Sequence, residues 1–433
     1  MKDRENLLLI FRAGLEAVAP DSALLTHLTV EKNSLSAGGK TFKIPDRGIR
    51  VIGAGKGSAP MALAFENLLG NRILQGFVVV KYGHELDLGH FEIAQAAHPV
   101  PDKAGENAAD KCLEIAGKCG PDDLLVCLFT GGASALLPAP VKGLTLEDMR
   151  ETTTVLLECG AEIGEINAIR RHLSRIGGGG IVRAAHGAHI LSLIVSDVIG
   201  DNLQDIASGP TARENTSFSD CLNIIKKYNI ASRLPKAALI HIEKGARTQN
   251  YNRDSELFEN VENVIIASNR QAMEAAAREA ARLGFGVAQE NRPLEGEARL
   301  AAKYLIDKAK KIKADISGKP VCLIAGGETT VTIRGRGKGG RNQEMALAAA
   351  LELENFSGIS ALFAGTDGTD GPVDAAGGFA FSNSVQEMGG RKNAESMLAD
   401  NDSHAALQKS GDLLITGPTR TNVMDLAIII IRP

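Results

Sequence analysis

Lysine, arginine and aspartate residues recur beside glycines in this chain, and each group suits anion binding or phosphoryl transfer. The segment Gly53–Ser58 reads GAGKGS between an apolar run and a segment of helix length. Backbone N–H groups at such a helix start favour an anion, and Lys56 adds a positive charge. The GxxxxGK(S/T) spacing of a Walker A loop is absent. The GxGxxG spacing is also absent, because Ser58 stands at its third glycine position. Gly55 and Lys56 are therefore candidate binding and catalytic residues, with a tight structural turn as the alternative.

The segment Thr130–Ser134 (TGGAS) repeats this arrangement after another apolar run. Backbone donors and hydroxyls here suit a carboxylate or phosphate, which makes Gly131, Gly132 and Ser134 candidates. An ordinary turn explains the pattern equally well.

The segment Glu165–Ser174 (EINAIRRHLS) predicts a helix. Asn167, either Arg170 or Arg171, and Ser174 then share one face at three- to four-residue spacing. We select Asn167 and Arg170 as candidates for a substrate carboxylate, and a solvated charged face is the alternative.

Aspartates follow two apolar runs. Asp197 ends the run LSLIVSD and could accept a hydroxyl proton, although a helix cap or Asx turn is an equal possibility. The segment 364–378 (AGTDGTDGPVDAAGG) carries Asp367, Asp370 and Asp374, whose hard oxygens suit Mg²⁺. We select Asp367 and Asp370 as metal ligands, with Asp-Gly turns as the alternative.

The densest cationic signal is the segment Gly326–Glu344 (GGETTVTIRGRGKGGRNQE). It predicts a strand, a turn, a second strand and a loop that opens a helix near Asn342. Guanidinium groups close to so many glycines suit a polyphosphate, and Arg341 is the candidate that stabilises the transferring phosphoryl group. The other candidates for binding here are Gly326, Gly327, Glu328, Thr329, Lys338, Gly339 and Gly340.

These motifs share one setting: a strand-length apolar run, then glycines, then a helix-length segment. This alternation predicts an α/β fold of mainly parallel sheets with helices on both faces, and ligands bind beyond the carboxyl ends of such strands. A chain of 433 residues exceeds one core, so two domains are expected. The polar stretch 244–260 predicts the boundary, giving domains 1–245 and 255–433.

Composition excludes several classes of protein. The net charge of −4 decides little about partners, but aromatic residues are only 4% of the chain and tryptophan is absent, which disfavours a nucleic-acid partner. No CxxC pair or membrane-length apolar run occurs, so we expect reduced cysteines, no membrane partner and a cytoplasmic location. The sequence leaves the oligomeric state open, a homodimer included.

Together the strings GAGKGSAPMA, AAHPVPD, TGGASALLPAP, SDVIGDNLQDIASGPT and TGPTRTNVMDL, with those above, resemble the glycerate 2-kinase family, which carries a MOFRL-type C-terminal domain. The resemblance spans nearly the whole chain. It implies two Rossmann-like domains with the active site in the interdomain cleft, ATP and Mg²⁺ as partners, and D-glycerate and 2-phosphoglycerate as substrate and product. It also implies that Lys56 and Arg341 are the catalytic residues. Relatives of this family have also been named hydroxypyruvate reductase.

Four positions depart from the family pattern. Thr130 and Ala133 replace a serine and a glycine, Gly177 replaces a lysine, and Arg420 replaces a glycine. These departures bear on the acceptor and leave open whether the 2- or 3-hydroxyl is phosphorylated.

The expected reaction is in-line transfer of the ATP γ-phosphoryl to D-glycerate, with Asp197 orienting the hydroxyl. An NAD(P)H-dependent hydroxypyruvate reductase is the first alternative. It lacks support in the sequence, since Lys81 stands where an acid would bind the ribose. The second alternative is a non-catalytic protein that binds a nucleotide or sugar acid.

Overall fold

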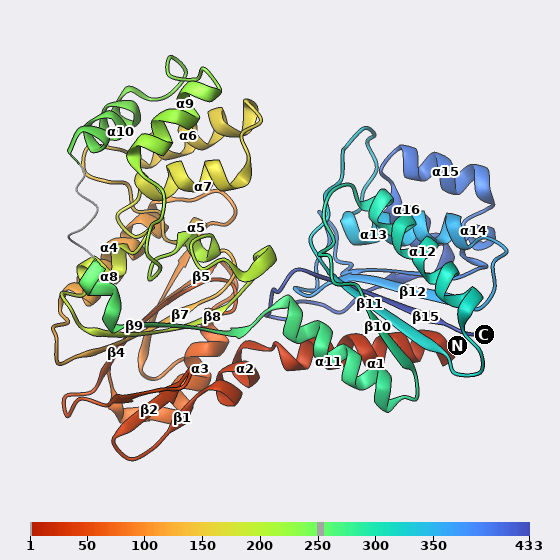
Figure 1. Ribbon diagram of the computed structural model, residues 1–433, viewed down its shortest axis with the longest axis horizontal. Coiled ribbons are helices and arrows are strands. Elements are labelled where there is room, and N and C mark those ends of the chain that lie inside the picture. Colours follow the sequence, from red (N-terminus) through yellow and green to blue (C-terminus); the bar gives the residue numbers. More distant parts are fainter. Residues whose placement is uncertain (1, 249–254) are drawn as a thin grey trace. The chain divides into compact units, whose positions relative to one another are not determined.

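The computed structural model describes residues 2–248 and 255–433, which fall into two compact units (Figure 1). The N-terminal unit covers Ala23–Ile266, and the C-terminal unit combines the residues up to Ser22 with Ala267–Pro433. This division differs from the predicted domains 1–245 and 255–433. Part of the predicted boundary, residues 249–254, lies outside the described residues.

Helix α1 (Lys2–Ala17) explains why the start of the chain joins the C-terminal unit. It buries Leu7, Ile10 and Phe11 and packs against helix α11 (Asn269–Arg282) and strand β15 (Asp425–Ile431). The helix itself was predicted from its amphipathic pattern, but that pattern does not reveal which sheet the apolar side covers.

The N-terminal unit is built on a six-stranded sheet of order β6-β5-β4-β7-β8-β9. Each strand pair from β6 to β8 is parallel, which confirms the prediction for this unit. Its strands are β4 (Ile49–Ala54), β5 (Ile73–Lys81), β6 (Phe91–Ala96), β7 (Leu124–Phe129), β8 (His189–Val195) and β9 (Val261–Ala267).

Helices cover both faces of this sheet (Figure 1). Helix α3 (Ser58–Leu69) packs on one face, while α4 (Lys103–Gly117), α5 (Ala133–Leu136) and α8 (Gly180–Ala184) share a core with the other. A small antiparallel sheet precedes them, with strands β1 (Thr29–Val30), β2 (Ser34–Ala37) and β3 (Lys40–Lys43).

A separate helical group carries the predicted substrate helix. Helices α6 (Leu146–Glu158), α7 (Ile163–His172), α9 (Phe218–Lys227) and α10 (Lys236–Thr248) enclose their own apolar core. Helix α7 confirms the helix expected in EINAIRRHLS. Short helix α2 (Pro20–His27) contains the point at which the two units divide.

The C-terminal unit has a six-stranded sheet of order β10-β11-β15-β12-β13-β14. Within the described residues only the β10–β11 pair of this sheet is parallel, so the prediction of a mainly parallel second sheet is wrong. A buried central strand has the same continuous apolar pattern in either orientation, and β15 runs against its two neighbours. The strands are β10 (Gly286–Gln289), β11 (Val321–Gly327), β12 (Ile359–Gly365), β13 (Gly377–Ala380), β14 (Leu413–Leu414) and β15.

Helices α1 and α11 cover one face of this second sheet, and α12 (Ala298–Asp315) and α13 (Arg341–Leu353) cover the other (Figure 1). Three shorter helices complete the unit: α14 (Ser384–Glu387), α15 (Arg391–Ala399) and α16 (Ser403–Ser410). The second strand predicted within GGETTVTI does not form, because β11 ends at Gly327 and only an isolated bridge follows at Thr330. Across residues 2–248 and 255–433, no helix has the length and apolar character needed to cross a bilayer.

Candidate active site

The two glycine turns of the N-terminal unit are hydrogen-bonded to each other at the carboxyl ends of β4 and β7. The N–H of Lys56 donates to the Gly131 carbonyl (3.0 Å), and the N–H of Gly57 donates to Thr130 Oγ1 (2.9 Å). Gly55 has a φ of 134°, and a Cβ there would lie 2.1 Å from Thr130 Oγ1. The close approach of these turns therefore requires glycine at 55.

The two turns differ in whether their backbone N–H groups remain available to bind an anion. The N–H groups of residues 55–58 all donate within the chain, so the predicted bare amides of GAGKGS are not free, and Gly55 acts in packing. In the TGGAS turn, by contrast, the N–H groups of Gly131 and Gly132 have no acceptor among the described residues. Buried amides without acceptors are uncommon, and an oxyanion would satisfy them.

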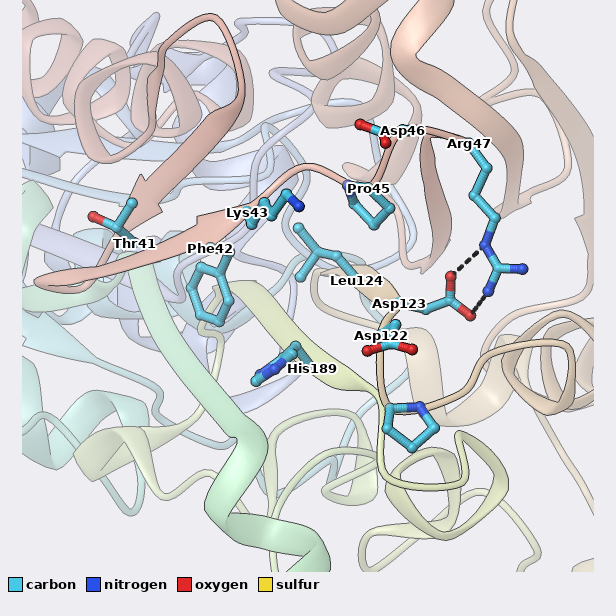
Figure 2. A pocket seen from close by; sticks show the side chains of 11 residues that line it. Thr41, Phe42, Lys43, Pro45, Asp46, Arg47, Asp122, Asp123, Leu124 and His189 are labelled. Atoms are coloured by element: carbon cyan, nitrogen blue, oxygen red, sulfur yellow. Dashed lines mark hydrogen bonds and ion pairs between the residues drawn. The ribbon is translucent and has the colours of Figure 1, made fainter.

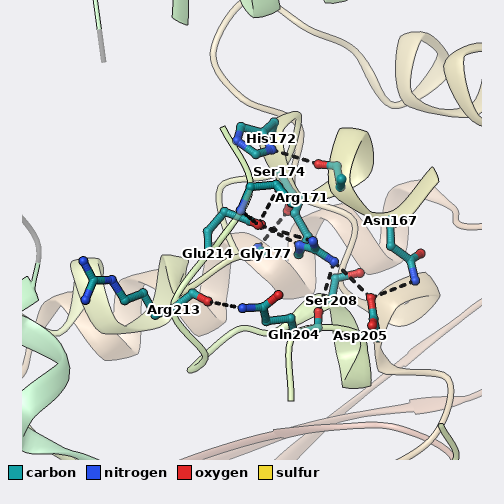
Figure 3. Close-up of polar contacts among 12 residues, drawn as sticks. Asn167, Arg171, His172, Ser174, Gly177, Gln204, Asp205, Ser208, Arg213 and Glu214 are labelled. Atoms are coloured by element: carbon teal, nitrogen blue, oxygen red, sulfur yellow. Dashed lines mark hydrogen bonds and ion pairs between the residues drawn. The ribbon is translucent and has the colours of Figure 1, made fainter. Parts of the chain in front are cut away.

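Ser134 and helix α7 are held to the loop that follows β8. Ser134 Oγ lies 2.9 Å from Ser208 Oγ, and Asn167 Nδ2 donates to Asp205 Oδ1 (3.2 Å). Figure 3 shows Arg171 at the centre of these contacts, donating to Asp205 (3.1 Å) and to Glu214 (2.5 Å). Arg171 is buried and neutralised by two carboxylates, so it fixes α7 in place.

Arg170 has the opposite environment. No side-chain hydrogen bond or ion pair reaches its guanidinium within residues 2–248 and 255–433, and burial lowers its pKa. The structure thus distinguishes the two arginines that the sequence left open. Arg170 is only partly buried, but removing a cation from water without a partner is still costly, and an anionic ligand would offset that cost.

The loop after β8 carries Asp197, which is half-buried. Three non-glycine residues of this loop adopt positive φ: Asp201 (55°), Ala207 (55°) and Ser208 (62°). Such conformations cost about 1–3 kcal/mol each and concentrate at functional sites.

In the C-terminal unit, three strand ends meet at one edge of the sheet. Asp425 begins β15 and pairs with Gly327 at the end of β11 and Gly365 at the end of β12. The buried carboxylate of Asp425 accepts from Arg341 Nε (2.6 Å) and Nη2 (3.0 Å), while Arg341 Nη1 lies 2.6 Å from Glu328. Arg341 is thereby fixed at this edge, and sequence reasoning missed Asp425 because its partner lies 84 residues away.

Burial opposes ionisation of this pair. It raises the pKa of Asp425 to about 6, despite the attraction of Arg341. The pKa of Arg341 is raised by its contact with Asp425, although burial acts against this. The guanidinium keeps its charge and still has N–H donors beyond those that bind Asp425 and Glu328.

The glycines of the cationic loop have a structural explanation. A Cβ at Gly335 would lie 2.2 Å from the Asp400 carbonyl oxygen, and one at Gly339 would lie 2.0 Å from Ser403 Oγ. The N–H of Lys338 donates to Asp402 Oδ1 (3.1 Å). This loop therefore packs on residues 400–403, while the side chains of Arg334, Arg336 and Lys338 are exposed.

Four other predicted binding residues of this segment also pack within the protein. A Cβ at Gly326 would lie 2.0 Å from Asn269 Oδ1, and one at Gly327 would lie 2.3 Å from the Leu294 carbonyl oxygen. Thr329 is buried with its hydroxyl 3.7 Å from Met345 Sδ. A Cβ at Gly340 would meet Asp370 at 2.4 Å, so close packing requires glycine at these three positions, and the side chain of Thr329 faces the protein interior.

Asp370 does not fit the predicted metal site. Its two carboxylate oxygens accept from the N–H groups of Asn342 (3.0 Å) and Gln343 (2.8 Å), and also from both side-chain amides. It therefore caps the start of α13 from a distant part of the chain. Asp367 Oδ1 accepts from Thr369, and the described residues contain no group of three or more His, Cys, Asp or Glu side chains suited to a metal ion.

Comparison with known proteins places this site in a family. A domain of unknown function, DUF4147, matches residues 6–243, and the MOFRL family matches residues 321–425. The glycerate 2-kinase of Pyrococcus horikoshii is 39% identical over 435 residues, covering 100% of this chain and 98% of that protein. The chain belongs to the glycerate 2-kinase family. The D-glycerate 2-kinase of Thermotoga maritima is also 39% identical, covering 97% of this chain and 96% of that protein.

Solved structures of the glycerate 2-kinase family agree with the fold. The crystal structure of Thermotoga maritima glycerate kinase has a TM-score of 0.86 and 37% identity, covering all of both chains. Two relatives from Agrobacterium vitis, 39% and 40% identical, carry hydroxypyruvate reductase in their names. The match to the kinases confirms the family predicted from the sequence motifs and makes this chain an enzyme of the kinase class.

Two departures from the family pattern have structural consequences. Arg420 is exposed and has a φ of 62°, a conformation that favours the glycine expected there. A Cβ at Gly177 would lie 3.2 Å from Arg171 Cα, so the lysine expected there needs a slight backbone adjustment. Thr130 uses its hydroxyl to hold Gly57, and Ala133 is buried at the start of α5.

A cavity of about 680 Å³ in the N-terminal unit lies elsewhere (Figure 2). It is lined by Phe42, Arg47 and Asp123, and by the first residues of β7 and β8, Leu124 and His189. Ligands of parallel sheets bind beyond the carboxyl ends of the strands, which is where the glycine turns of this unit lie. This cavity lies at the amino ends and is therefore not the candidate active site.

Proposed function

We propose that this member of the glycerate 2-kinase family transfers the γ-phosphoryl group of ATP to the 2-hydroxyl of D-glycerate, giving 2-phosphoglycerate and ADP. Full-length similarity to proteins named glycerate 2-kinase supports this acceptor. The observation that carries the proposal is the partly buried guanidinium of Arg170, which lacks an acidic partner within the described chain. A small hydroxy acid supplies the carboxylate that such a site needs.

The acceptor binds at the carboxyl edge of the N-terminal sheet in this proposal. Arg170 and the free amides of Gly131 and Gly132 bind anionic oxygens, and Asn167 and Ser134 shape the site from α7 and α5. Asp197 orients the 2-hydroxyl and accepts its proton as the oxygen–phosphorus bond forms. The proton thus moves to the carboxylate while ADP leaves with the electrons of the broken bond.

In this proposal Lys56 and Arg341 neutralise the charge of the phosphoryl group. Positioning and charge neutralisation supply most of the catalysis in phosphoryl transfer, because little covalent chemistry is required of the protein. Glu328 competes with a phosphate for Arg341 and must release it, while Lys338 adds a flexible charge. Mg²⁺ arrives with the nucleotide as part of the substrate, since Mg²⁺ commonly binds through phosphate oxygens and few carboxylates. Asp367 is the remaining candidate to contact its water shell.

The decisive experiment identifies the product. The enzyme is incubated with D-glycerate and MgATP, ADP release is followed in a coupled assay, and phosphorus NMR distinguishes 2- from 3-phosphoglycerate. The expected result is stoichiometric ADP and 2-phosphoglycerate. ADP release no faster than without glycerate would refute the proposal, and 3-phosphoglycerate would refute its regiochemistry.

Two Agrobacterium vitis relatives are named as putative hydroxypyruvate reductases, so the alternative of an NAD(P)H-dependent reductase is tested as well. Loss of NADH or NADPH absorbance on addition of hydroxypyruvate would support a reductase. We expect no such loss, since Lys81 and not an acid stands near the end of β5, where a ribose would bind.

A further inference from the structure

His98 follows β6 and lies against the TGGAS turn. A Cβ at Gly132 would lie 3.0 Å from Cδ2 and 3.1 Å from Nε2 of His98, and 3.6 Å from Cγ of Lys56. The imidazole, the turn and the stem of Lys56 are therefore neighbours at the carboxyl edge of the sheet. The absence of a side chain at Gly132 is what lets Nε2 approach a turn with free amides.

The groups that act electrostatically on His98 are all basic. They are Lys56 from the turn after β4, Lys81 at the end of β5 and His84 from the following loop. Burial and then these three basic groups lower the pKa of His98 to about 4. The ring is consequently neutral at physiological pH, with a proton on one nitrogen.

This environment suits an anion that is not part of the protein. An oxyanion beside Lys56 would counteract the effect of the three basic groups on His98. It would therefore favour the protonated form of the imidazole ring. An opposite charge within about 4–6 Å favours the charged form of a titratable group, so an occupied site would raise the pKa of His98 from its lowered value.

We propose that His98 is a ligand-binding residue of the phosphotransfer site, whose ring binds an oxygen of the same phosphoryl group that Lys56 neutralises. This inference rests on the proposed function for the identity of the ligand. The geometry alone specifies an oxyanion, phosphoryl or carboxylate, bound between the turn and the two basic side chains.

NMR of the whole protein tests the inference directly. The nine histidines are labelled at Cε1, and the His98 signal is assigned as the one missing from the His98→Gln variant. Its pH titration is recorded alone and with saturating inorganic phosphate, 2-phosphoglycerate or D-glycerate, with saturation established by calorimetry. We expect the pKa of His98 to rise with both phosphate ligands.

The outcomes separate this inference from the proposed function, because kinase activity is assayed on the same sample. Turnover with an unmoved His98 signal under saturating phosphate ligand overturns the inference and leaves the function. A raised pKa without turnover supports the inference and overturns the function. A rise in the pKa with D-glycerate alone assigns the site to a carboxylate and overturns the phosphoryl assignment. The phosphoryl assignment is also overturned if neither phosphate ligand binds.

Variants provide a second, independent measurement. We expect His98→Leu to lower kcat/KM at least tenfold and His98→Gln, which retains an amide donor, to lower it less. His189→Gln, at the amino end of β8, is the matched control and should behave as wild type. Equal kcat/KM for His98→Leu and wild type would contradict the proposal, whereas a variant that fails to fold leaves the NMR titration as the deciding result.

Discussion

The guanidinium of Arg171 is enclosed by Asp205 and Glu214, whereas no carboxylate of the described chain reaches Arg170 one residue earlier. These adjacent residues therefore have different tasks, one holding α7 and the other available to a ligand. The two acidic partners of Arg171 lie 34 and 43 residues further along the chain, which is why spacing on the helix alone could not separate the two arginines.

We expect Arg170→Gln to raise the KM for D-glycerate by about tenfold to hundredfold, because a hydrogen bond to a charged group contributes about 1.5–3 kcal/mol. Arg170→Lys retains the charge and should lose less. The coupled ADP assay measures both. Arg233→Gln is the control, since that arginine pairs with Glu158 at the surface. An unchanged KM in Arg170→Gln would remove this residue from the site.

Asp425→Asn should lower kcat at least tenfold near neutral pH, because Arg341 loses the charged partner that orients it. The variant should also change the pH dependence of stability. Burial raises the pKa of Asp425 to about 6, above its unfolded value of about 4, so its favourable contribution is full below about pH 4 and lost as pH rises through 6. Thermal unfolding from pH 4 to 8 should show this dependence in the wild type and not in Asp425→Asn. A wild-type kcat in the variant would contradict the positioning role.

At the scale of turns and helices, glycine and capping residues hold the proposed catalytic side chains in place. Gly55→Ala should destabilise the protein by about 2–4 kcal/mol and reduce activity, since the added Cβ meets Thr130 in a turn that holds Lys56. Gly70→Ala is the matched control, because Gly70 also has a positive φ (48°) but no atom within 4 Å of the place that an added methyl group would take. Thermal unfolding distinguishes them. Equal losses in both variants would show that backbone conformation, and not the clash, is responsible.

The start of α13 depends on Asp370, which is why Arg341 emerges there in a fixed direction. We expect Asp370→Ala to lower the free energy of unfolding by about 1–3 kcal/mol, because buried N–H donors lose their acceptor. The Mg²⁺ concentration giving half-maximal activity should stay unchanged, as measured by titration at fixed ATP. A large increase in that concentration would restore Asp370 as a metal ligand.

At the scale of the whole molecule, the alternation of apolar runs and glycines predicted the two α/β units and most of their strands. It did not predict the orientation of β15 or the place of α1, because both depend on contacts between segments far apart in the sequence: β15 pairs with β11 and β12, and α1 packs on α11 and β15. The same reason explains the site. Lys56, Arg170 and Arg341 were predicted as candidates from their residue types and motifs, whereas Asp425 and the partners of Arg171 are identified only in the folded chain.

The place of α1 gives a further prediction. Phe11→Ala should destabilise the protein by about 3–5 kcal/mol, the usual cost of removing a buried ring. Limited proteolysis should then cleave the C-terminal unit, which α1 covers, before the N-terminal unit. Leu9→Ala serves as control, because Leu9 is 42% exposed on the same helix. Cleavage that begins in the N-terminal unit would contradict the assignment of α1.

The position of β15 in its sheet also sets an order of events during synthesis. This strand follows every other described element in the chain, yet it lies between β11 and β12 and contacts α1. The N-terminal unit is contiguous in sequence and can fold while the ribosome is still translating. The C-terminal sheet must wait with an open central gap until β15 emerges, so a premature stop before Asp425 removes the sheet's central strand and the anchor of Arg341 together.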